Sequence, residues 1–100
     1  MPQIANLYSE SNKVPFDQFD HEVLELMERV GERVRKARGA KGIPRRVLSD
    51  ISGVSQRYLA QLEAGKGNIS IGLLKRVAIA LDVSLEGLVA ENEYSDSEIC

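Results

Sequence analysis

Three long polar side chains lie close together on one short stretch of the chain. Gln56, Arg57 and Gln61 stand between Ser55, which can cap a helix, and Gly65, which can end one. At about 100° per residue, Arg57 and Gln61 fall on one face of such a helix, and its leucines fall on the other. Gln can pair with the edge of adenine, and Arg with the edge of guanine. We therefore expect a helix with its outer face suited to contacting bases.

Side chains suited to catalysis or metal binding are few. The sequence has one histidine, His21, and one cysteine, Cys100, whereas a zinc site takes three or four protein ligands. The acidic pair Glu22 and Glu25 is accounted for by the preference of acids for the start of a helix. No set of nucleophile, base and acid is present. We expect no enzyme activity, no metal and no cofactor.

The elements that must position the polar helix have the spacing of a helix-turn-helix. A short helix is predicted over 45–52, with Pro44 at its first position, where proline is tolerated. Gly53 can adopt the left-handed backbone of a tight turn, and Val54 can fill the space beneath it. The second helix is predicted over 56–64. The leucines expected to hold the pair against the core are Leu48, Leu59 and Leu62.

Three further helices complete the predicted fold. The first starts with Asp20 as its N-cap and is stopped by Gly39 and Gly42. Ser70 can cap a fourth helix and Ser84 a fifth. The apolar positions expected to face the core are Val23, Leu26, Met27, Val30, Val34, Ala37, Val47, Ile51, Ile71, Leu74, Val77, Ala78, Leu81, Leu85, Leu88 and Val89. The sequence predicts an all-α domain of five helices.

Composition divides the chain into three parts. Residues 1–19 lack a helical period and are predicted to form a flexible arm, and residues 20–90 form the helical domain. Residues 91–100 are predicted to be an acidic tail or the start of a linker. No apolar run is long enough to span a bilayer, and no signal peptide precedes the domain. With a single cysteine, the chain suits a reducing cytoplasm.

Charge is unevenly distributed along the chain. The net charge is −2, but residues 33–66 hold nine Lys and Arg against two acids, a local excess of seven positive charges. Residues 91–100 hold four acids and no base. A basic middle segment is where a polyanion would bind. Together with the polar helix, it favours double-stranded DNA as the partner.

Residues 34–89 resemble the DNA-binding domain of the lambda-repressor-like, XRE-type family. The resemblance lies in the stretches "RVRKARGAKGI", "LSDISGVSQRYLAQLEAGKGNIS" and "LLKRVAIALDVSLEGLV". It implies a five-helix fold whose second and third helices form the helix-turn-helix of a bacterial transcriptional regulator, a homodimer on a palindromic operator. Within the family, the sequence is similar to the N-terminal domains of benzoate-degradation regulators. Those proteins continue into a shikimate-kinase-like domain, so a small-molecule effector is expected only if a further domain exists.

The resemblance also assigns roles to individual residues. Base contacts fall to Gln56, Arg57 and Gln61. DNA phosphate contacts fall to Arg45, Ser55, Tyr58, Lys66 and Asn68. Arg38 and Glu63 resemble a buried structural ion pair of the family. Two positions depart from its pattern, because Pro44 replaces a capping residue and Ser49 replaces a small alanine.

Two alternatives stay open from the sequence. The same fold serves antitoxin-like or adaptor modules that bind a protein, a function that would favour an apolar, non-basic third helix. The apolar residues Leu85, Leu88 and Val89 could form a dimer interface or belong to the domain's own core.

Overall fold

The computed structural model describes residues 18–66 and 68–92. Five helices follow one another there: α2 (Gln18–Lys41), α3 (Arg45–Ser52), α4 (Gln56–Glu63), α5 (Ile71–Leu81) and α6 (Leu85–Val89). These ranges contain no strand, and none of their helices is long and apolar enough to cross a membrane. The prediction of an all-α, five-helix fold is confirmed.

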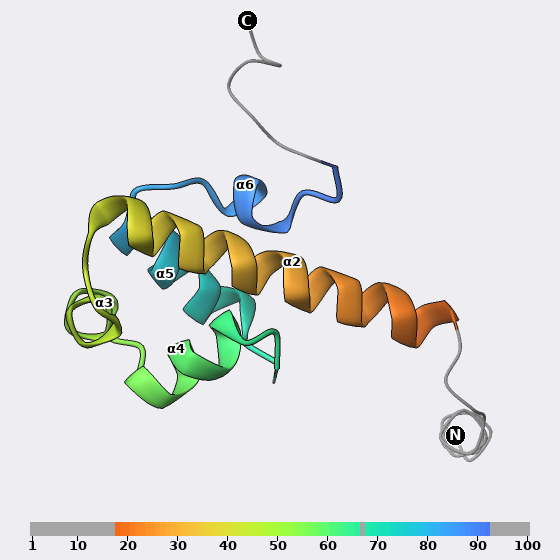
Figure 1. The fold of residues 1–100 in the computed structure, drawn as a ribbon, viewed down its shortest axis with the longest axis horizontal. Coiled ribbons are helices and arrows are strands. Elements are labelled where there is room, and N and C mark those ends of the chain that lie inside the picture. Colours follow the sequence, from red (N-terminus) through yellow and green to blue (C-terminus); the bar gives the residue numbers. More distant parts are fainter. Residues whose placement is uncertain (1–17, 67, 93–100) are drawn as a thin grey trace, which may run out of the picture.

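The long helix α2 organises the molecule. It packs against α4, α5 and α6, and its first turns extend beyond the rest of the body (Figure 1). The helix begins at Gln18, so the prediction of Asp20 as N-cap was wrong, and Asp20 lies within the first turn. The rest of the predicted arm, residues 1–17, and residues 93–100 of the predicted tail lie outside the described residues.

The C-terminal end of α2 also differs from the prediction. Gly39 does not stop the helix, which continues to Lys41. A glycine inside a helix costs only about 1 kcal/mol relative to alanine, so packing against other elements can override it. Gly42 does end the helix, because its φ of 70° reverses the chain there.

The core lies between α2 and the remaining helices. Its largest fully buried side chains are Leu48, Leu59, Val34, Val54 and Val77. The predictions that Ile51 and Ile71 face inward were wrong, because both are exposed. The short helix α3 buries only Leu48 and Ser52, one turn apart, and Ile71 is the first residue of α5. The same prediction was wrong for Val23 and Leu26 in the first half of α2, because both are exposed.

The C-terminal segment is fixed to α2 by Arg33. Its guanidinium donates hydrogen bonds to the carbonyl oxygens of Gly87, Leu88, Ala90 and Asn92, at 2.6–3.3 Å. Leu88 is buried in the core, and Leu85 and Val89 pack against it while partly exposed. Of the two alternatives for these apolar residues, the structure favours the domain's own core.

Candidate nucleic-acid interface

The turn between α3 and α4 has the geometry that the sequence predicts. Gly53 has a φ of 78°, and its N–H donates to the carbonyl of Ser49 at 2.9 Å. Val54 is buried beneath the turn, and its N–H donates to Oγ of Ser52 at 3.1 Å. Arg76 of α5 donates to the carbonyl of Ser52 at 3.2 Å. The turn is therefore held by hydrogen bonds from both sides, which fixes the angle between the two helices.

The start of α3 differs by one position from the prediction. Pro44 is the N-cap and lies in extended conformation, so Arg45 is the first helical residue. No side chain caps this end of α3. Proline fixes its own φ but has no side-chain acceptor, so the amides of the first turn are not satisfied by a side-chain cap. Such an end suits an anion, and Arg45 and Arg46 add positive charge to it.

Helix α4 presents the three predicted base-contacting side chains to solvent. Ser55 is its N-cap, as predicted, and Oγ of Ser55 accepts a hydrogen bond from the N–H of Tyr58 at 3.1 Å. Gln56, Arg57 and Gln61 are exposed. The opposite face is buried and consists of Leu59, Leu62 and Glu63. The helix ends at Glu63, one residue before the predicted end.

The residues predicted to contact phosphates lie at the start of α3, at the start of α4 and in the loop after α4. Ser55 and Tyr58 lie at the start of α4, whereas Arg45 is the first residue of α3 and its side chain contacts Glu63, at the other end of α4; all three are exposed. Lys66 and Asn68 are exposed in the loop after α4, where Gly65 turns the chain with a φ of 74°. The exposed residues of α4 thus have cationic or hydrogen-bonding side chains before and after them along the chain.

A cluster of charged side chains beneath this surface joins three helices. Glu63 has a side chain that is only 2% exposed, and it accepts two hydrogen bonds from Arg38 of α2, at 2.7 and 2.9 Å. This is the structural pair that the resemblance implies. Arg45 of α3 also donates to Glu63, at 3.2 Å, a contact that the sequence did not indicate. The side chain of Arg45 remains 44% exposed, so its charge still reaches the surface.

The protonation of Glu63 depends on this cluster. Burial by itself would raise the pKa of the Glu63 carboxyl, but hydrogen bonds and charges from Arg38 and then Arg45 outweigh it. The pKa of Glu63 therefore lies below its ordinary value of 4.5, and the group is ionised at neutral pH.

Acidification should remove the stability that Glu63 contributes. Because the pKa is lower in the folded than in the unfolded state, the contribution is complete above pH 4.5 and is lost as the pH falls towards the folded-state value. Urea unfolding between pH 7 and pH 3 measures this loss. The Glu63→Gln variant should lack the part of this pH dependence that comes from Glu63, whereas Glu32→Gln, on the exposed side of α2, should keep it. An unchanged profile in Glu63→Gln would assign the acid sensitivity to other groups.

Comparison with known proteins identifies the fold's relatives. A family model described as helix-turn-helix matches residues 34–88, more than half of the chain. The chain belongs to the helix-turn-helix family. The matched residues include α3, α4 and α5 entirely, and the turn at Gly53 lies within them.

Individual relatives of this helix-turn-helix protein are regulators. It is 32% identical over 68 residues to the HTH-type transcriptional regulator SinR of Bacillus licheniformis, and equally to SinR of Bacillus subtilis (strain 168). The match covers 67% of this chain and 61% of each relative, so the chain spans about three fifths of their length. The crystal structure of the restriction-modification controller protein C.AhdI from Aeromonas hydrophila superposes with a TM-score of 0.60 and 32% identity. It covers 62% of this chain and 94% of C.AhdI.

Proposed function

We propose that this helix-turn-helix protein is a sequence-specific, DNA-binding transcriptional regulator that inserts α4 into the major groove. The observation that carries the proposal is the outer face of α4, where Gln56, Arg57 and Gln61 are all exposed on a helix fixed by the turn at Gly53. The names of its relatives, two transcriptional regulators and a controller protein, support the same function. A protein-binding adaptor would favour an apolar outer face on α4, whereas the outer face of α4 in this protein carries a cation and two amides.

The contacts divide into those that select sequence and those that set position. Gln56, Arg57 and Gln61 would contact base edges, since Gln suits adenine and Arg suits guanine. Phosphates would be bound by the exposed residues at the start of α3, at the start of α4 and in the loop after α4, namely Arg45, Ser55, Tyr58, Lys66 and Asn68. Oγ of Ser55 already accepts the N–H of Tyr58, and its hydroxyl hydrogen remains able to donate to a phosphate.

The regulator is proposed to act as a homodimer in the cytoplasm. One domain of this size offers few base contacts, so two copies on a palindromic operator would supply the selectivity that one lacks. Their half-sites would lie about one helical turn of DNA apart, roughly 34 Å.

Changing the base-contacting residues tests the proposal. Arg57→Ala and Gln61→Ala should each weaken binding to the preferred duplex by about 1–3 kcal/mol and relax the preference at one base position. The preferred duplex is first selected from a random pool, and affinities are then measured by fluorescence anisotropy at several salt concentrations. These side chains are exposed and pack on nothing in the core, so folding should be unaffected.

Lys66→Ala provides the matched control, since it removes an exposed cation outside α4. It should weaken binding to all duplexes alike and reduce the salt dependence by about one counterion, without changing the preferred sequence. The base-contact assignment fails if Arg57→Ala and Gln61→Ala select the same sequences as the wild-type chain. The regulator proposal itself fails if no sequence is enriched and affinity does not depend on salt.

A further inference from the structure

Two arginines share one carboxylate beneath the proposed DNA-binding surface. Arg38 occupies both oxygens of Glu63, with its Nε on Oε2 at 2.7 Å and a terminal nitrogen on Oε1 at 2.9 Å. Arg45 adds one bond, from its Nε to Oε1 at 3.2 Å. The carboxylate therefore already has a bidentate partner in Arg38, and the two cations of the cluster exceed its one anion.

The two arginines differ in how their guanidinium groups are used. The remaining terminal nitrogen of Arg38 donates to the carbonyl of Ile43 at 3.0 Å, so all three of its nitrogens are bonded. Arg45 is bonded only through Nε, and its side chain is 44% exposed although that of Glu63 is 2% exposed. No described residue accepts a hydrogen bond from the two terminal nitrogens of Arg45. These two nitrogens are therefore available to a ligand.

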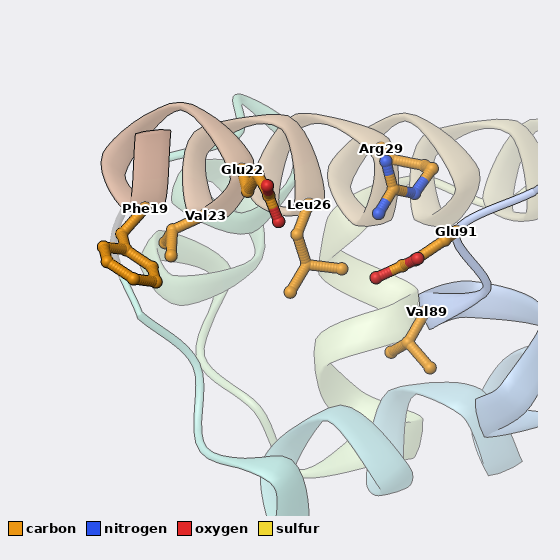
Figure 2. A pocket seen from close by; sticks show the side chains of 7 residues that line it. All are labelled: Phe19, Glu22, Val23, Leu26, Arg29, Val89 and Glu91. Carbon is orange, nitrogen blue, oxygen red and sulfur yellow. The ribbon is translucent and has the colours of Figure 1, made fainter. Parts of the chain in front are cut away.

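Other arginines that lie against the body of the domain face internal acceptors. Arg33 donates to the carbonyls of four residues within 87–92. Arg29 lies opposite the carboxylate of Glu91, across the hollow between α2 and the segment that follows α6 (Figure 2). Arg45 differs from both, because a buried carboxylate holds its Nε while the end of the side chain has no acceptor in the described part of the chain.

We propose that Glu63 is the positioning residue for a DNA contact made by Arg45, which binds one phosphate through its two terminal nitrogens while its Nε stays on Glu63. This inference rests on the proposed DNA-binding function and concerns how one of its phosphate contacts is made. A guanidinium is planar and rigid, so a hydrogen bond at Nε restricts the direction of the other two nitrogens. Those two can then meet two oxygens of the same phosphate.

The location of Arg45 fits a phosphate of the DNA backbone. Its partner Glu63 is the last residue of α4, two residues after the proposed base contact Gln61. Lys66, another proposed phosphate contact, is exposed three residues further on. The sugar-phosphate backbones border the major groove, so a cation beside the end of a helix in that groove lies near a phosphate. The phosphate would also compensate the surplus positive charge that Arg45 brings to the cluster.

Arginine can make both contacts at once, and lysine cannot. Lysine carries its charge on a single nitrogen at the end of a flexible stem, so at position 45 it would bind either the carboxylate of Glu63 or a phosphate. Arg45→Lys should therefore weaken binding to the preferred duplex by about tenfold. The salt dependence should change by less than about one counterion, because the positive charge is kept.

The neighbouring arginine gives a matched control. The side chain of Arg46 is 68% exposed, and its contact is with the exposed Asp50, one turn away at 4.0 Å. Arg46→Lys makes the same replacement one residue along, keeps the positive charge at the start of α3 and alters no hydrogen bond to Glu63. It should leave the affinity within about twofold. Urea unfolding should show both lysine variants folded, since the pair of Arg38 and Glu63 is intact in each.

A double variant tests the part played by Glu63. In Glu63→Gln the bond to Arg45 loses the charge that strengthens it, so Arg45 is held less firmly. Adding Arg45→Lys to Glu63→Gln should therefore cost no more than about threefold in affinity, against about tenfold in the wild type. Equal costs in the two backgrounds would overturn the positioning role.

Replacing single phosphates tests the contact with Glu63 unchanged. Uncharged methylphosphonates are introduced one at a time along the selected duplex, and the affinities of the wild type and Arg45→Lys are compared. At one phosphate of each half-site, the replacement should cost the wild type more affinity than it costs the variant. If Arg45 only stabilised the fold, both proteins would lose the same affinity at every phosphate, and that result overturns the proposal.

The outcomes separate this inference from the proposed function. If the wild type selects a sequence but Arg45→Lys binds within about twofold of it, or Arg46→Lys weakens binding as much, the inference is wrong and the regulator stands. If the wild type enriches no sequence and its affinity does not depend on salt, the proposed function fails and this inference fails with it.

Discussion

Replacing Glu63 by Ala should lower the free energy of unfolding by about 3–5 kcal/mol. The change leaves the guanidinium of Arg38 partly buried without its bidentate partner and removes the acceptor of Arg45. A domain of this size has a total stability of about 5–15 kcal/mol, so the variant should be close to unfolding at physiological temperature. Urea denaturation followed by circular dichroism measures the difference. The Glu63→Gln variant keeps the shape of the side chain and removes its charge. Its free energy of unfolding should lie between those of Glu63→Ala and the wild type.

An exposed ion pair on α2 supplies the control for Glu63. Glu32 and Lys36 are one turn apart, 3.4 Å between charged atoms, and both side chains are largely in solvent. Glu32→Ala should therefore cost no more than about 1 kcal/mol. If both alanine variants lost the same amount of stability, burial of Glu63 would not explain the cost of removing it.

Gly31→Ala should destabilise the fold by about 1–3 kcal/mol or more, as overpacking does. Gly31 lies where α2 crosses the end of α4. A Cβ there would collide with the carbonyl oxygen of Leu62 and lie 3.1 Å from the carbonyl oxygen of Glu63 and from the N of Gly65. These are backbone atoms, so the helices themselves must move apart. Thermal unfolding of the variant measures the cost.

Gly39 on the same helix gives a control of opposite sign. A Cβ at Gly39 would meet no atom within 4 Å. Gly39→Ala should therefore stabilise the protein by about 0.5–1 kcal/mol, because alanine loses less backbone entropy in a helix. A loss of stability in Gly39→Ala, or no loss in Gly31→Ala, would contradict the close crossing of α2 and α4.

The turn and the caps were predictable from local rules. Gly53 was predicted to be left-handed and Val54 buried, because a tight turn between helices needs both. Ser55, Ser70 and Ser84 were predicted as N-caps, and each accepts an N–H three residues later, at 2.9–3.1 Å. These features depend on a few neighbouring residues, so the sequence contains all that decides them.

Contacts between distant segments were not predictable in the same way. Arg45 and Glu63 are 18 residues apart, and only the crossing of α3 and α4 brings them together. Arg33 meets carbonyls more than 50 residues away, and carbonyls leave no pattern in a sequence. A glycine within a helical pattern, such as Gly31, is a weak signal of close packing. Whether another backbone does approach that glycine depends on the tertiary fold.

The apolar periodicity predicted more burial than the fold provides. Val23 and Ile71 continue the stripes of their helices, yet both are exposed near the N-terminal ends of α2 and α5. Periodicity identifies which side of a helix is apolar, but not how far along the helix the neighbouring elements reach. The predicted base contacts are all on the exposed face of α4, and their role remains a prediction until DNA binding is measured.

The cluster around Glu63 has a thermodynamic consequence for binding. Because it ties α2, α3 and α4 together in the free protein, the surface proposed to meet DNA is already assembled. Association then need not order the helices, so its heat-capacity change should reflect the contact surface alone. It should lack the large negative value that accompanies coupled folding and binding. Calorimetry should give a more negative heat-capacity change of DNA binding for the Glu63→Gln variant than for the wild type, because binding of the variant is then linked to completing the fold.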